Sequence, residues 1–255
     1  MKKKVIICTV LCAIVCIVSC KKEPSTSTPH DNIFVPYEYT FDGYTRTFAG
    51  QELPYRIARI GDVQGGNSRL VIYLHGGTSR GSDNEAQLSE PAVDSIARYL
   101  ANKSQPSVLI VPQCPANGNW DSPRMRDGIK ALLQSYIDSG YVNPRSIFIL
   151  GGSMGGTGTW NILSAFPHFF AAGMPCAGNP SRASADSIAL IPVYTVMGTA
   201  DNIMSIPTVD TFMMQLNSRG AAYRYDVEPG WTHQQTCIES YTTARLDWLF
   251  SHQNE

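Results

Sequence analysis

A serine in a setting suited to nucleophilic attack lies in the segment Gly151-Gly152-Ser153-Met154-Gly155. In this G-x-S-x-G pattern, a sharp turn between a strand and a helix exposes the serine hydroxyl above a sheet. The apolar run from Ile147 to Leu150 precedes the turn as a buried strand would, and residues at helical spacing follow it. A phosphate-binding turn is the alternative, but the Gly-Lys-Ser/Thr of a P-loop does not follow. We therefore predict that Ser153 is a nucleophile.

A nucleophilic serine needs a general base, and the chain offers five His. His30 and His252 lie in the two end segments, and His168 follows Phe-Pro at a predicted helix end. His75 opens a Gly-Gly turn after an apolar run, where it fits an anion-binding turn. His233 lies in a predicted loop after the last strand, at the edge of an α/β sheet where ligands gather. We predict that His233 is the base.

The base in turn needs an acid that orients it and stabilises its charged form. Asp201 lies just past an apolar strand that ends at Met197, and it precedes His233 by 32 residues. Nucleophile, acid and base then follow one another in an order known for such triads. Asp226 is the alternative, but it lies inside a predicted strand. Asp201 is the predicted acid.

Negative charge that develops on an attacked carbonyl oxygen must be met by hydrogen-bond donors. The N–H group of Met154, the residue after the nucleophile, is one predicted donor. The second is predicted in the turn His75-Gly76-Gly77-Thr78, as the N–H group of Gly77. A plain tight turn is the alternative there.

These residues are carried by strands and helices that alternate from residue 37 onward. The segment 37–60 predicts two or three antiparallel strands at a sheet edge. The alternation after it predicts a mostly parallel sheet with helices on both faces, in a single domain over residues 37–255. The predicted strands are 70–74, 108–111, 147–150, 171–175, 192–197 and 223–227, and the predicted helices are 91–102, 125–137, 154–166, 207–218 and 239–250.

Five motifs occur in order over residues 50–250: Leu74-His75-Gly76-Gly77, Arg80-Gly81-Ser82-Asp83-Asn84, Val111-Pro112-Gln113-Cys114-Pro115 with Trp120, Gly152-Ser153-Met154-Gly155-Gly156 with Trp160, and Gly198-Thr199-Ala200-Asp201. Together they resemble the α/β-hydrolase branch of esterase D-like and feruloyl-type carboxylesterases and the proteins called predicted peptidases. The resemblance implies an eight-stranded α/β-hydrolase fold and serine esterase chemistry. It also implies that Ser153, Asp201 and His233 form the triad, with no metal or organic cofactor.

Three tryptophans follow or adjoin the predicted strand ends: Trp120, Trp160 and Trp231. They are candidates for an aromatic wall around an aryl acyl group or a sugar, and core packing is the alternative for each. No long insertion interrupts the predicted core, so we expect an open pocket without a large lid.

The first 36 residues predict export and anchoring. Residues 1–4 are positively charged and residues 5–18 are apolar, which is the length of a secretory signal. Ile17-Val18-Ser19-Cys20 resembles a bacterial lipobox, with a plain signal peptide or short anchor as the alternative. We therefore predict a signal peptide over 1–19, lipidation of Cys20 and a flexible tether over 20–36. The domain would then be lipid-anchored to the bacterial cell envelope, at the outer membrane on its periplasmic or surface face.

Composition narrows the classes of function. The chain has 255 residues, a net charge of −1 and 43% hydrophobic residues, which suits a sizeable core and gives no sign of nucleic-acid binding. The domain carries Cys114, Cys176 and Cys237 without a CxxC pair, so buried free thiols are expected and one disulfide is possible. The expected function is a serine carboxylesterase that removes feruloyl, acetyl or similar acyl groups from polysaccharide or small esters. A serine peptidase acting on short peptides and a non-catalytic binding lipoprotein are the alternatives.

Overall fold

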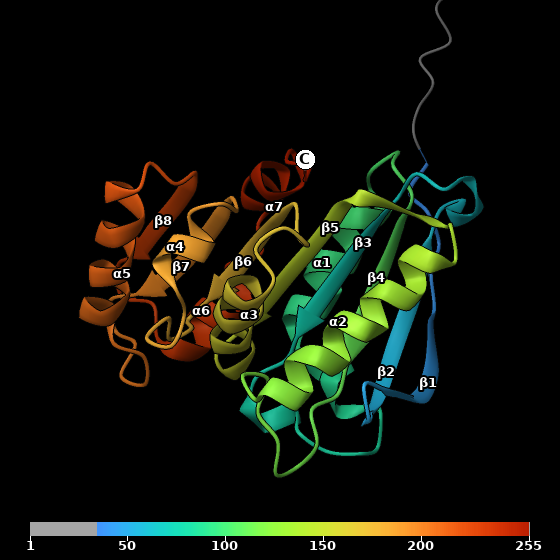
Figure 1. Cartoon of the computed structure of the whole chain (residues 1–255), viewed down its shortest axis with the longest axis horizontal. Helices are drawn as coiled ribbons and strands as arrows, with labels where there is room; N and C mark the ends of the chain where they lie inside the picture. Colours follow the sequence, from blue (N-terminus) through green and yellow to red (C-terminus); the bar gives the residue numbers. More distant parts are fainter. Residues whose placement is uncertain (1–34, 255) are drawn as a thin grey trace, which may run out of the picture. The chain divides into compact units, whose positions relative to one another are not determined.

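The computed structural model describes residues 35–254, which form an eight-stranded sheet in the order β1-β2-β4-β3-β5-β6-β7-β8 (Figure 1). The strands β1 and β2 pair antiparallel, β2 and β4 also pair antiparallel, and the remaining neighbours are parallel. The strands are β1 (Phe41–Phe48), β2 (Gln51–Ile60), β3 (Ser68–Leu74), β4 (Ser107–Pro112), β5 (Val142–Gly152), β6 (Ala172–Cys176), β7 (Val193–Gly198) and β8 (Tyr223–Glu228). This is the mostly parallel sheet that the alternation predicts.

Helices cover both faces of the sheet, as predicted. Alternate residues of β3 point to opposite faces: Leu70 and Ile72 pack with the helices of one face, and Val71 packs with those of the other. One face carries α2 (Pro123–Asp138), α3 (Met154–Ala165), α4 (Ala185–Ile188) and α5 (Ile206–Ser218), and the other carries α1 (Pro91–Ala101) and α7 (Thr243–Phe250). The sheet is therefore buried between two apolar cores.

The sequence-based boundaries fail at β5. This strand begins at Val142, before the predicted start at Ile147. Asn143, Pro144 and Arg145 interrupt the apolar run there, and their half-buried or exposed side chains gave no strand pattern.

The predicted last helix over 239–250 ends at Phe250 as expected, but its predicted start is wrong, because a separate helix precedes it. The helix α6 spans His233–Glu239, and α7 begins only at Thr243. Thr232 caps α6 in a reciprocal pair with Gln235, and the Thr242 side chain accepts a hydrogen bond from the Arg245 N–H group at the start of α7. His233 is therefore the first residue of a helix rather than a loop residue.

The predicted signal peptide, Cys20 and nearly all of the predicted tether lie outside the described residues. Within residues 35–254, no helix has the length and apolar character needed to cross a membrane.

Candidate active site

Ser153 lies on a strained turn between β5 and α3. Its backbone has φ 57° and ψ −117°, a conformation that non-glycine residues rarely adopt. The Ser153 N–H group donates to the Cys176 carbonyl oxygen at 3.1 Å, which ties the turn to the end of β6. A Cβ atom at Gly155 would lie 1.8 Å from the Leu74 carbonyl oxygen, so the first turn of α3 packs backbone to backbone against β3. This close packing requires the glycine of the motif.

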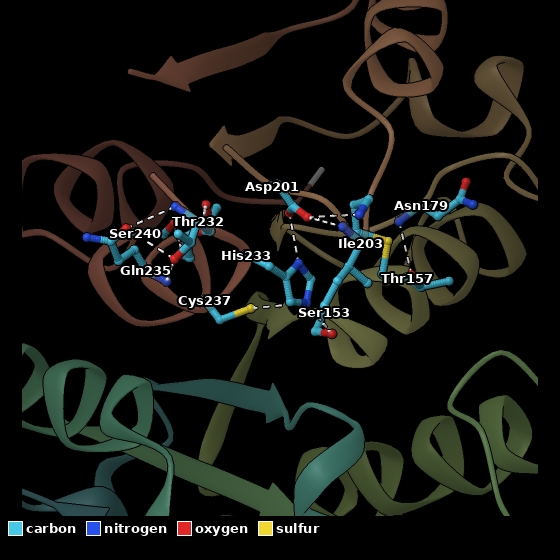
Figure 2. A network of polar contacts seen from close by, with 12 residues as sticks. Ser153, Thr157, Asn179, Asp201, Ile203, Thr232, His233, Gln235, Cys237 and Ser240 are labelled. Atoms are coloured by element: carbon cyan, nitrogen blue, oxygen red, sulfur yellow. Dashed lines mark hydrogen bonds and ion pairs between the residues drawn. The ribbon is translucent and has the colours of Figure 1, made fainter. Parts of the chain in front are cut away.

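The structure brings Ser153, His233 and Asp201 into one hydrogen-bonded line (Figure 2). The His233 Nε2 atom is 2.8 Å from Ser153 Oγ, and His233 Nδ1 is 2.8 Å from Asp201 Oδ2. The Asp201 carboxylate is fully buried and the His233 side chain is 13% exposed. Because a carboxylate only accepts hydrogen bonds, it fixes the proton of His233 on Nδ1. Nε2 is then free to accept the Ser153 hydroxyl proton.

Backbone groups hold the Asp201 carboxylate in place. Its second oxygen, Oδ1, accepts hydrogen bonds from the N–H groups of Ile203 at 2.8 Å and Met204 at 2.9 Å (Figure 2). Three donors therefore converge on one buried carboxylate and hold it in position beside His233.

Asp226 lies elsewhere, on β8. Its Oδ2 atom accepts hydrogen bonds from the Tyr194 hydroxyl at 2.8 Å and the Arg245 Nε–H group at 2.9 Å. The same Arg245 pairs with Glu228 and lies over the Trp231 ring at 5.7 Å from its centroid. Asp226 thus helps to hold the segment between β8 and α6 and does not contact His233.

Cys237 follows His233 by one turn of α6, and its Sγ atom is 4.0 Å from His233 Nε2 (Figure 2). Burial raises the pKa of this thiol to about 12, so it is neutral at ordinary pH. Cys237 is half-buried and free, Cys114 and Cys176 are free and buried, and burial raises the pKa of each of these two to about 11. A neutral, buried thiol is a poor nucleophile. Cys237 therefore packs beside the base without competing with Ser153.

One predicted oxyanion donor, the N–H group of Met154, directly follows Ser153, and the other belongs to Gly77, which follows a residue that lies against Ser153. Met154 is the first residue of α3 and Gly77 is the first residue of a short 3₁₀ helix, Gly77–Ser79. The N–H groups at the start of a helix have no acceptor within it. A Cβ atom at Gly76 would lie 3.7 Å from Ser153 Cβ, so the turn before Gly77 lies directly against the nucleophile.

The His75 ring holds this turn through both of its nitrogen atoms. Nδ1 lies 2.6 Å from the Gly76 carbonyl oxygen, and Nε2 accepts a hydrogen bond from the Cys114 N–H group at 2.9 Å. Burial lowers the pKa of His75 to about 4, so the ring is neutral and Nδ1 is the donor. Both ring nitrogens are used within the protein, so the His75 side chain holds the turn, and the prediction that this turn binds an anion rests on its backbone N–H groups.

The predicted aromatic wall does not form. Trp160 is fully buried, and its ring packs against Phe212 at a centroid distance of 5.2 Å. Trp231 packs under Arg245, beside the core of the other face. Trp120 is fully buried as well, and its Nε1–H group donates to the His75 carbonyl oxygen at 2.9 Å. Of the three indoles, Trp120 alone borders the pocket beside Ser153, and its role there is mainly packing.

That pocket has a volume of about 350 Å³, and Met154, the residue after Ser153, lines it. Thr157 follows on the same face of α3, and its Oγ1 accepts a hydrogen bond from the Asn179 N–H group at 3.0 Å (Figure 2). An ion pair between Arg182 and Asp121, at 2.9 Å, forms another side. The lining is therefore mostly polar. The sequence did not single out Asp121, Thr157, Asn179 and Arg182, which lie on α3 and on loops far apart along the chain. Among residues 35–254, no cluster of His, Cys, Asp and Glu could hold a metal ion.

No protein-family model matches the chain. A curated bifunctional acetylxylan esterase/xylanase of Neocallimastix patriciarum is 23% identical over 150 residues, which are 58% of this chain and 21% of that protein. This chain therefore spans about a fifth of the curated relative.

Solved structures match over most of the domain. A thermostable esterase has a TM-score of 0.69 and 26% identity, over 84% of this chain and 63% of that one. A feruloyl esterase module of Clostridium thermocellum, solved with sinapinate, has a TM-score of 0.64 and 14% identity over 87% and 96% of the two chains. A puromycin-hydrolyzing peptidase of Mycobacterium tuberculosis has a TM-score of 0.64 and 16% identity over 82% and 39%. Strand order, strand direction and these likenesses together identify the chain as a protein of the α/β-hydrolase fold.

Proposed function

We propose that this protein is a serine carboxylic-ester hydrolase. The observation that carries the proposal is the hydrogen-bonded line from Ser153 through His233 to the buried Asp201 carboxylate. Nucleophile, base and orienting acid are the three groups that acyl transfer through a serine requires. The esterases among the similar proteins support the same reading.

In the proposed reaction, His233 Nε2 takes the Ser153 hydroxyl proton while Oγ attacks the ester carbonyl carbon. The N–H groups of Met154 and Gly77 donate to the carbonyl oxygen as it becomes negative. The protonated His233 then gives its proton to the departing alkoxide, which leaves an acyl group on Oγ. A water molecule, deprotonated by His233, attacks this acyl-enzyme and releases the carboxylic acid and free Ser153.

The proposed substrates are acetyl, feruloyl or similar esters of polysaccharide or small alcohols. The names of the curated relative and of the feruloyl esterase module support these acyl groups. The polar pocket beside Met154, with Thr157, Asn179 and the Arg182–Asp121 pair, suits the hydroxyl-rich alcohol part of such an ester. The buried indoles offer little aromatic surface for an aryl group, so we rank acetyl esters of sugars above feruloyl esters.

A serine peptidase acting on short peptides is the second candidate, because the fold also occurs in a puromycin-hydrolyzing peptidase. The candidates can be separated by hydrolysis rates on three substrates: acetylated xylan oligosaccharides, methyl ferulate and short peptides. We expect the acetylated sugars to give the highest kcat/KM. Short peptides as the best substrates would contradict the esterase proposal.

A non-catalytic binding protein is the remaining alternative, and a fluorophosphonate tests it. We expect the reagent to label the purified domain at Ser153, because the adjacent His233 makes this hydroxyl nucleophilic. Peptide mass spectrometry would locate the label, and the Ser153→Ala variant is the control. A domain that stays unlabelled under conditions that label a known serine esterase would favour the binding protein.

We further propose that the protein is exported and anchored through a lipid on Cys20. The lipobox-like segment Ile17–Cys20 supports this cellular location. We expect metabolic labelling with a fatty-acid analogue to mark the full-length protein and to fail on the Cys20→Ala variant. A variant with Cys16→Ala is the matched control and should be labelled normally. An unlabelled wild type would contradict the anchor.

A further inference from the structure

Glu90 connects three elements beside the proposed active site. It is the residue directly before α1, and its side chain makes no hydrogen bond to the first turn of that helix. Its Oε1 atom instead accepts hydrogen bonds from the Gly76 N–H group and the Ser79 hydroxyl, both at 2.8 Å. Its Oε2 atom accepts one from the Tyr73 hydroxyl at 2.8 Å.

The partners of Glu90 lie on both sides of Gly77. Tyr73 is the second-to-last residue of β3, and Gly76 directly precedes Gly77. Ser79 is the last residue of the short helix that Gly77 begins. Tyr73 is fully buried and Ser79 is 4% exposed. One carboxylate therefore holds the chain before and after the Gly77 N–H group. Three donors on one carboxylate make a charge-assisted cluster, which is stronger than neutral hydrogen bonds.

The same carboxylate lies close to the nucleophile. A Cβ atom at Gly76 would lie 3.4 Å from Glu90 Oε1 and 3.7 Å from Ser153 Cβ, so Gly76 separates the two residues. Because the Gly76 N–H group is already bound by Glu90, it is unavailable to a substrate. The next N–H group along the chain, that of Gly77, remains for this purpose.

We propose that Glu90 is a positioning residue of the oxyanion hole, which fixes the Gly76–Ser79 turn so that the Gly77 N–H group faces the carbonyl oxygen of the substrate. This inference rests on the proposed esterase function. It predicts that loss of the carboxylate affects the transition state more than substrate binding, because the oxyanion exists only after attack has begun.

The first test compares steady-state rates on an activated acetyl ester. We expect Glu90→Ala to lower kcat by about 10²-fold with KM changed by less than about threefold, since one oxyanion donor is worth roughly 10²–10³ in kcat. Glu90→Gln should recover most of the loss, because its amide oxygen can still accept from Gly76 and Ser79. Asp94→Asn, on an exposed ion pair of α1 with Arg98, is the matched control and should match the wild type. A Glu90→Ala variant with wild-type kcat would overturn the proposal.

The second test needs no activity. Amide hydrogen exchange should become faster at Gly76 in Glu90→Ala, while amides within β3 such as that of Ile72 keep their protection. Faster exchange with normal kcat would show that the carboxylate only stabilises the turn, which contradicts a role in positioning. A wild-type protein that hydrolyses no ester would refute the proposed function. Unchanged amide exchange at Gly76 in Glu90→Ala would refute the role of Glu90.

A third variant covers a failure of Glu90→Ala to fold. Ser79→Ala removes one of the two turn contacts and leaves the carboxylate in place. We expect a smaller loss of kcat, on the order of threefold to tenfold, again at nearly constant KM. A Ser79→Ala variant whose KM rises while kcat stays constant would contradict the proposal.

Discussion

Replacing Ser153 by Ala should lower kcat for ester hydrolysis by about 10⁴–10⁶-fold and leave KM nearly unchanged. The Ser153 hydroxyl forms the covalent bond of the acyl-enzyme, and an alanine methyl group has no equivalent chemistry. His233→Ala should lose as much, because the serine hydroxyl then has no acceptor for its proton at 2.8 Å. Steady-state rates with one activated acetyl ester measure both effects.

The double variant tests whether the two residues act together. Members of a triad serve one step, so Ser153→Ala with His233→Ala should be hardly slower than either single variant. A double variant whose loss is the product of the two single losses would mean that His233 is not the partner of Ser153. Thermal unfolding of each variant is the control, and we expect Tm within a few degrees of the wild type.

The second large effect is expected at Asp201. Replacing Asp201 by Asn keeps the shape of the side chain, but the amide favours the wrong tautomer of His233 and cannot stabilise its charged form. A change of this kind costs about 10⁴-fold in kcat in a serine triad. The Asp201 carboxylate is fully buried and bonded to His233 Nδ1 at 2.8 Å, so solvent cannot replace it.

Asp226→Asn is the matched variant for this prediction. Asp226 carries the same charge, but it binds Tyr194 and Arg245 and not His233. Its substitution should change kcat less than about tenfold, because its carboxylate makes no contact with the reacting groups. Steady-state rates of both variants decide the assignment. An inactive Asp226→Asn protein beside an active Asp201→Asn protein would mean that the acid is misassigned.

Short sequence patterns predicted the strands and turns whose conformation depends on neighbouring residues in the chain. The apolar runs that form β3 and β4 and the G-x-S-x-G turn identified the sheet and Ser153, because a buried parallel strand and a glycine-dependent turn leave direct marks on the sequence. Asp201 and His233 could be proposed because parallel strands bring their carboxyl ends to one edge. The sequence prediction placed no helix at His233, although Thr232 and Gln235 form a capping box, because the apolar residues that indicate a helix lie further along the chain.

Other features depend on contacts that leave no such mark. The hydrogen bond from the Gly76 N–H group to the Glu90 side chain joins residues 14 positions apart. The burial of Trp120 depends on an acceptor, the His75 carbonyl oxygen, that belongs to a different strand end. The polar pocket combines Asp121, Thr157 and Arg182 from separate segments. Spacing along the chain predicts none of these, because each is decided by tertiary packing.

The contact between Gly155 and the Leu74 carbonyl oxygen leaves no room for a side chain between the start of α3 and the end of β3. Backbone atoms have no rotamers to exchange, so the separation of Ser153 from the Gly76–Gly77 turn is insensitive to the side-chain fluctuations that follow a distant substitution. Substitutions in helices that carry none of the proposed site residues, such as α2 and α5, should then change how many molecules are folded, and the turnover of each folded molecule should stay the same. Sequence drift can therefore proceed across the outer layers of this protein without altering its reaction, as long as these two backbone segments remain in contact.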